Sequence, residues 1–180
     1  MRKTLLTTLF VILSFTMAHA QTRYGVKAGA NIATLAGAEG VSSKFGFHVG
    51  GIIEFKLSER FAIQPELLYS AQGAKNSEDS GYKINFNYLN VPLMAKYYVA
   101  EGISIEAGPQ FGVAVTLEDS DGRDLEVTHE TIDYGLNIGG GYELPSGLFF
   151  QARYYAGLMN ISINDDYKNS VLQFSVGYKF

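Results

Sequence analysis

Several residue types are absent or scarce in this sequence of 180 residues, and each absence excludes something. There is no cysteine, which excludes disulfide bonds and thiolate metal sites. No segment reaches the roughly 18 consecutive apolar residues of a membrane-spanning helix. Charged residues make up 18%, below the usual share of a soluble domain, about 25%. The net charge is −4 without any basic run, so nucleic acid is not an expected partner.

The residues that are abundant indicate β-structure. The chain has 20 glycines, 12 tyrosines and 12 phenylalanines, and 47% of its residues are hydrophobic. Its mean hydropathy is nevertheless only +0.03. A chain that is rich in apolar residues but neutral on average is typical of strands in which apolar and polar residues alternate.

The first 20 residues have the pattern of an export signal. Arg2 and Lys3 precede an apolar stretch over 5–15, and Ala18-His19-Ala20 is a small-x-small cleavage site. The apolar stretch is too short to cross a bilayer. We therefore expect a signal peptide over 1–20 and one exported domain over 21–180.

The exported part divides into eight segments with an apolar residue at every second position. In the last one, the side chains of Leu172, Phe174 and Val176 share one face, and those of Gln173 and Ser175 share the other. This period of two predicts β-strands. The predicted strands are 23–35, 44–57, 61–73, 84–98, 103–115, 131–144, 148–158 and 171–180.

The connections between these segments alternate in length. Three are tight (58–60, 99–102 and 145–147), and four are long and polar (36–43, 74–83, 116–130 and 159–170). Membrane barrels show the same alternation of connection lengths, with short turns on the periplasmic side and long loops outside. We predict an all-β fold, an eight-stranded antiparallel up-and-down transmembrane β-barrel in the outer membrane.

The polar face of the strands is expected to line the barrel interior. It carries glycines such as Gly29, Gly50 and Gly108, and a narrow eight-stranded interior has room for little side-chain volume. The alternative is a soluble barrel or sandwich with its apolar face inside. Alternation also places charged residues on the polar face, and we expect them to pair across the lumen. The predicted lumen charge network is Glu54, Glu66, Lys96, Glu106, Asp133 and Arg153.

Aromatic residues gather on the apolar face at the predicted periplasmic strand ends. Such residues suit the membrane–water interface and predict an aromatic girdle. The C-terminal Phe180 ends an alternating aromatic strand, as in proteins that the barrel-insertion machinery recognises. The predicted girdle is Tyr24, Phe55, Phe61, Tyr97, Tyr142, Phe150, Tyr178 and Phe180.

Several segments together resemble a known family, the small outer-membrane β-barrel proteins of Bacteroidetes, often labelled PorT-like or porin-family. They are 24–32 (YGVKAGANI), 63–70 (IQPELLYS), 88–97 (YLNVPLMAKY), 106–112 (EAGPQFG) and 151–155 (QARYY). The resemblance implies an eight-stranded barrel, and its motifs name no substrate. Some relatives imply a role in assisting secretion on the periplasmic side.

No catalytic, cofactor or metal motif stands out. His48 is expected to face the lumen, where a hydrogen-bonded structural role is favoured over hydrolytic chemistry. The acidic segment 118–124 has oxygen ligands for Ca²⁺ but lacks EF-hand spacing, so a solvated loop is the default.

The sequence therefore predicts a non-enzymatic outer-membrane barrel without a cofactor. Its expected partners are outer-membrane lipid, the insertion machinery through Phe180, and an unidentified partner of the extracellular loops. The alternatives are a narrow channel for small solutes, a barrel-embedded enzyme, and a periplasmic-side secretion or assembly accessory.

Overall fold

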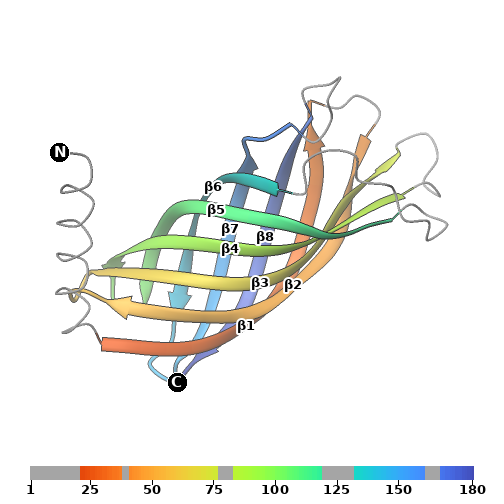
Figure 1. The fold of residues 1–180 in the computed structure, drawn as a ribbon. Helices are drawn as coiled ribbons and strands as arrows, with labels where there is room; N and C mark the ends of the chain where they lie inside the picture. Colours follow the sequence, from red (N-terminus) through yellow and green to blue (C-terminus); the bar gives the residue numbers. More distant parts are fainter. Residues whose placement is uncertain (1–20, 38–40, 77–82, 119–131, 161–166) are drawn as a thin grey trace, which may run out of the picture.

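The computed structural model of the protein describes residues 21–37, 41–76, 83–118, 132–160 and 167–180. These residues form eight strands, as predicted (Figure 1). No helix among them is long and apolar enough to cross a membrane. The strands are β1 (Gln21–Ala36), β2 (Val41–Lys56), β3 (Phe61–Asn76), β4 (Lys83–Ala100), β5 (Ile103–Glu118), β6 (Ile132–Glu143), β7 (Leu148–Gly157) and β8 (Lys168–Lys179).

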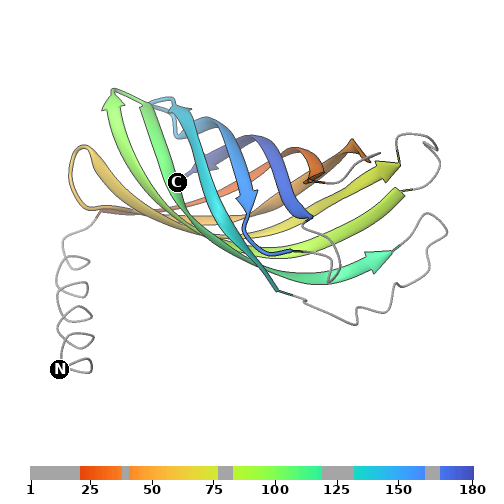
Figure 2. The same ribbon diagram turned by 90° about the horizontal axis from the view of Figure 1, so that it is seen from above.

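The strands form one closed barrel in chain order, which Figures 1 and 2 show from two sides. Each strand is antiparallel to the next, and β1 pairs with β8 from Gly25↔Lys179 to Ala36↔Lys168. This closure removes the free edges that an open sheet would expose. The predicted eight-stranded antiparallel up-and-down barrel is confirmed.

The two ends of the barrel differ. The tight connections 57–60, 101–102 and 144–147 lie at one end, together with Gln21 and Phe180, and we call it the turn end. Two of these turns contain a glycine at positive φ, Gly102 at 74° and Gly147 at 92°, a conformation that other residues rarely adopt. The opposite end, from which the long connections leave, is the loop end.

Several strands extend further toward the loop end than the sequence predicted. β3 continues to Asn76 instead of 73, and β5 continues to Glu118 instead of 115. Apolar alternation was the sequence signal, and it weakens where polar or charged residues such as Lys75, Asn76 and Thr116 follow. The backbone ladder continues there, and β4 and β5 remain paired as far as Asn85↔Glu118.

The wall of the barrel is apolar outside and polar inside. Outward side chains such as Phe45 and Ile138 are 71% and 64% exposed, whereas the inward Glu54 and Arg153 are 0% and 1% exposed. This is the opposite of the alternative with an apolar interior. The buried core of the described barrel is therefore largely polar and charged, with a few apolar residues such as Leu68 and Met94, and most large apolar residues form the outer belt.

Candidate functional site in the barrel lumen

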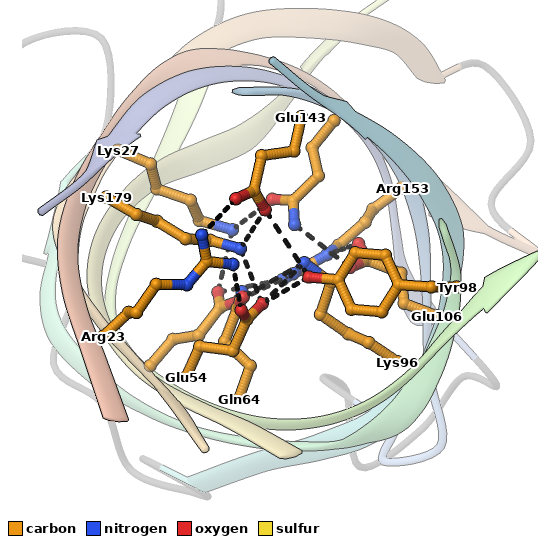
Figure 3. Close-up of polar contacts among 12 residues, drawn as sticks. Arg23, Lys27, Glu54, Gln64, Lys96, Tyr98, Glu106, Glu143, Arg153 and Lys179 are labelled. Atoms are coloured by element: carbon orange, nitrogen blue, oxygen red, sulfur yellow. Dashed lines mark hydrogen bonds and ion pairs between the residues drawn. The ribbon is translucent and has the colours of Figure 1, made fainter. Parts of the chain in front are cut away.

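The lumen near the turn end holds a group of charged side chains that we call the turn-side cluster (Figure 3). Every strand of the barrel contributes at least one member. Five members are cations and four are carboxylates, linked by ion pairs of 3.2 Å or less. The members are Arg23, Lys27, Glu54, Glu66, Lys96, Glu106, Glu143, Arg153 and Lys179.

Arg153 is the member that crosses the lumen. Its Nη1 and Nη2 atoms donate to the two carboxylate oxygens of Glu66 at 2.9 and 2.6 Å, and its Nε donates to Glu106. A planar guanidinium suits this forked geometry, because its donors match two carboxylates at once. Lys27 adds a second cation to Glu66, with its Nζ 2.8 Å from Oε2. β7 is thus tied through the interior to β3, β5 and β1.

Glu54 is the second centre of the cluster and lies nearer the turn end. Its Oε2 atom accepts hydrogen bonds from Lys179 Nζ at 2.6 Å and from the Tyr98 hydroxyl at 2.8 Å. Lys96 Nζ lies 3.2 Å from the same oxygen, and Arg23 donates to Oε1. A buried carboxylate is costly unless it is paired, and Glu54 has three cationic partners.

The cluster spans the barrel from wall to wall. Because an eight-stranded barrel has an interior about as wide as its side chains can fill, linked side chains of this size occupy its cross-section. Seven members are buried, and only Arg23 and Glu143, at the turn-end margin, have side chains that are 27% and 12% exposed. The arrangement is suited to holding opposite walls together.

The structure brings together five of the six residues of the predicted lumen network: Glu54, Glu66, Lys96, Glu106 and Arg153. Asp133 is also buried but lies apart from them, and its Oδ2 atom accepts a hydrogen bond from Asn169 at 2.8 Å. The predicted network omitted Glu143 of β6 and Lys179 of β8, and it also omitted two cations of β1, Arg23 and Lys27. The alternation that places Gly25 and Gly29 inside would also have identified them.

Beyond the cluster, the lumen is lined mainly by amides and hydroxyls, and we call this part the loop-side lumen. Gln72, Asn90, Asn137 and Gln173 are each at most 2% exposed, and each has at least one amide atom without a hydrogen-bond partner. Such atoms normally bind water. The residues of the loop-side lumen are Asn31, His48, Ser70, Gln72, Tyr88, Asn90, Gln110, Asp133, Asn137, Tyr155, Asn169, Gln173 and Ser175.

His48 lies between two partners in the loop-side lumen. Its Nδ1 is 2.8 Å from Asn31 Oδ1, and its Nε2 is 2.8 Å from Ser175 Oγ. The Asn31 amide nitrogen donates to the backbone oxygens of Phe47 and Ala71, both at 3.0 Å, which fixes the amide orientation. His48 therefore donates through Nδ1–H to Asn31 and accepts from the Ser175 hydroxyl.

A serine, a histidine and an orienting amide in this order also occur in nucleophilic catalysis. Here Ser175 is 7% exposed and His48 is 1% exposed. The β2–β3 ladder shifts register between Ser43 and His48, and Asn31 bonds the backbone oxygens beside this irregularity. The Asn31–His48–Ser175 group therefore fits a polar plug, whose hydrogen bonds satisfy backbone groups beside the irregularity in the sheet. Sequence alternation alone could not predict this group.

A cavity of about 710 Å³ opens at the turn end, and we call it the vestibule. Its lining includes Tyr98, Lys56, Arg60, Glu101 and Tyr142. Lys56 Nζ lies 5.3 Å from the centre of the Tyr98 ring, a distance that suits a cation–π contact. Since Tyr98 also bonds Glu54, the turn-side cluster forms the floor of the vestibule.

The predicted girdle residues lie on the outer face near the turn end. Seven of them are 38–70% exposed, from Phe61 to Phe180, whereas Phe55 is half-buried. Among the residues that the structure describes, no group of three His, Cys, Asp or Glu could hold a metal ion. Most of the acidic segment 118–124, from Asp119 onward, lies outside the described residues, as does the predicted signal peptide over 1–20.

A closed barrel with an apolar outer wall and an ion-paired interior defines an integral membrane β-barrel. The chain belongs to the family described as "Outer membrane protein beta-barrel domain", whose model matches residues 19–162. It is therefore an outer-membrane barrel protein. No curated protein has significant sequence similarity to the chain.

Solved structures of small outer-membrane barrels share this fold. The Neisserial surface protein A structure is 15% identical, with a TM-score of 0.61, and the match covers 87% of this chain and 97% of that one. Ail, the attachment invasion locus protein of Yersinia pestis, in complex with the heparin analogue sucrose octasulfate, is also 15% identical. Its TM-score is 0.54, and the match covers 89% of this chain and 99% of that one.

Proposed function

We propose that this protein is a non-enzymatic, non-conducting barrel that acts as a membrane scaffold for its extracellular loops. The observation that carries the proposal is the turn-side cluster, in which Arg153 links Glu66 and Glu106 across the lumen. An ion entering from the loop end would have to displace these paired side chains. The loops, and not the lumen, are then the part of the molecule that is free to specify a partner.

The proposal orients the barrel with its turn end toward the periplasm, as short turns are in bacterial outer-membrane barrels. The aromatic girdle would lie at the inner membrane–water interface, in contact with lipid. Phe180 would serve the insertion machinery, and residues 1–20 would be removed on export. The motifs in 24–32 and 88–97 further suggest kinship with the PorT-like barrels of Bacteroidetes.

The charge of one long loop segment indicates which kind of extracellular partner it could bind. Segment 116–130 contains six carboxylates and one arginine: Glu118, Asp119, Asp121, Asp124, Glu126 and Glu130 against Arg123. Ail was solved with a sulfated heparin analogue. An acidic segment repels such a polyanion, so we propose a neutral or basic partner for this chain.

Planar-bilayer recording of the purified barrel tests the closed lumen. We expect no steady single-channel current from the unaltered protein. The double variant Glu66→Ala/Arg153→Ala removes the crossing pair without changing the net charge, and it should admit small ions. Stable current steps from the unaltered protein would overturn the proposal in favour of a narrow channel.

The vestibule supports a second candidate, an accessory role for secretion or assembly on the periplasmic side. Its volume of about 710 Å³ is typical of a binding site, about 300–1,000 Å³. Lys56 and Arg60 line it, and neither has an ion-pair partner among the described residues. A photo-crosslinker at Glu101 should then capture a periplasmic partner, and Lys56→Glu/Arg60→Glu should abolish the adduct. A crosslinker at the outward-facing Val113 is the control, and an adduct that persists in the charge-reversed variant would contradict this role.

A further inference from the structure

The outer wall of the barrel carries an apolar groove near the turn end. It has a volume of about 370 Å³ and extends across β3, β4, β5 and β6. The lining side chains on the outer face are apolar or aromatic: Phe61, Ala95, Tyr97, Ile105, Ala107 and Ile138. These residues take no part in the lumen chemistry described above.

The strand register explains why the wall is hollow at this place. Ala95 of β4 is directly opposite Ala107 of β5, so two small side chains lie next to each other on the outer face. Ile63 pairs with Ala95 on one side, and Ile138 pairs with Ala107 on the other. The two alanines thus form a floor between bulky walls.

The next outward row toward the turn end forms the rim of the groove. Phe61 pairs with Tyr97, and Tyr97 pairs with Ile105. Tyr97 and Phe61 also belong to the predicted aromatic girdle. An amphipathic tyrosine suits a rim that faces lipid headgroups, while the floor faces hydrocarbon.

Two outward alanines on β1, Ala28 and Ala30, lack this arrangement. Ala28 of β1 lies between Val49 and Val176, and Ala30 lies between Phe47 and Phe174. Each is a single small residue between two large ones in its row. Neither lines the groove, so these two alanines provide a matched control.

We propose that the groove binds one acyl chain of a membrane phospholipid as a resident ligand. The groove opens on the wall of a membrane protein, where it is continuous with the lipid-facing belt, and its apolar floor offers a hydrocarbon chain full contact. Nine residues line it, whereas a stable protein interface takes about 20–30 residues a side. A single flexible chain therefore fits it better than a second copy of the barrel.

Native mass spectrometry of the full barrel, purified in mild detergent, tests the proposal. The unaltered protein should retain one phospholipid per barrel. Ala95→Leu/Ala107→Leu fills the floor with outward-facing side chains and should lower the retained fraction at least tenfold. Ala28→Leu/Ala30→Leu should retain the lipid, and heat-modifiable gel migration verifies that all three proteins are folded.

A second measurement keeps the test independent of detergent. In vesicles of phosphatidylcholine with a chain-attached nitroxide, the motionally restricted signal should fall by one lipid per barrel in Ala95→Leu/Ala107→Leu only. The proposal is overturned if the unaltered barrel retains no lipid, or if the filled variant binds as much as the control. It is also overturned if the unaltered protein is a dimer and the Ala95→Leu/Ala107→Leu variant is a monomer.

Discussion

The turn-side and loop-side halves of the lumen lie within the same wall, yet they are built from different chemistry. On β3 the inward Glu66 lies in the charged half and Gln72 in the amide half, and on β4 Lys96 is followed toward the loop end by Asn90. All four residues are at most 4% exposed. Burial alone therefore does not decide which polar residue a barrel interior carries.

The difference lies in how each kind of side chain is satisfied. A buried charge needs an opposite charge within a few ångströms, so most buried ionic residues are gathered where Arg153 and Lys179 reach several carboxylates. Asp133 lies apart from them and accepts a hydrogen bond from Asn169. An amide can be satisfied by water, so Asn137 and Gln173 tolerate unpartnered atoms on the loop side. The turn-side half is a cross-brace of ion pairs, and we expect the loop-side half to be hydrated.

Arg153→Ala should produce the largest loss of stability, because it leaves Glu66 and Glu106 buried without this partner. We expect about 3–5 kcal/mol less free energy of unfolding. Arg23→Ala, at the margin of the same cluster, should cost about 1 kcal/mol or less, since solvent screens its pairs. Urea titration of both variants in detergent micelles provides the measurement. Equal losses would show that the cluster does not work as a brace.

Substitutions of two glutamines, one in each half of the lumen, allow the two halves to be compared directly. Gln64 donates to Glu66 at 2.6 Å and accepts from Lys96 at 3.3 Å, whereas both amide atoms of Gln173 lack a protein partner. Gln64→Leu should therefore cost about 1–3 kcal/mol, and Gln173→Leu should be nearly neutral. Both side chains are at most 1% exposed, so burial is matched. A larger loss for Gln173→Leu, measured by the same titration, would contradict a hydrated loop-side lumen.

The smallest expected effect concerns Ser175. If the Asn31–His48–Ser175 group is a structural plug, the folded barrel should not react with a fluorophosphonate probe. In-gel detection after a long incubation measures this, and heat-denatured protein gives the background. Labelling of the unaltered protein that disappears in both Ser175→Ala and His48→Ala would instead establish an activated serine.

The sequence predicted the fold well because apolar alternation and the turn pattern are local properties. It also assigned Glu66, Lys96 and Arg153 to the interior, because alternate residues of a strand point to opposite faces of the sheet. This alternation does not give the position of a residue around the barrel or along its axis. The partners of Arg153, and the separation of Asp133 from the cluster, depend on the stagger between strands and could not be predicted.

The plug around His48 was hidden for a related reason. A register shift such as that between Ser43 and His48 leaves no clear mark in the alternation, so the role of Asn31 beside it was invisible. The groove on the outer wall likewise depends on the pairing of Ala95 with Ala107. The loop-side ends of β3 and β5 were predicted too short because the sequence signal was apolar alternation and not backbone hydrogen bonding.

The ion pairs join segments that are far apart in the chain, and this has a consequence for assembly. Lys179 in the last strand bonds Glu54 in the second, and Arg23 in the first strand bonds Glu143 in the sixth. Neither the Lys179–Glu54 pair nor the Arg23–Glu143 pair can form until the first and last strands come together and close the barrel. A half-inserted sheet would leave these two pairs unformed in hydrocarbon, so lipid penalises an open barrel, and the chain should enter the membrane in one cooperative event.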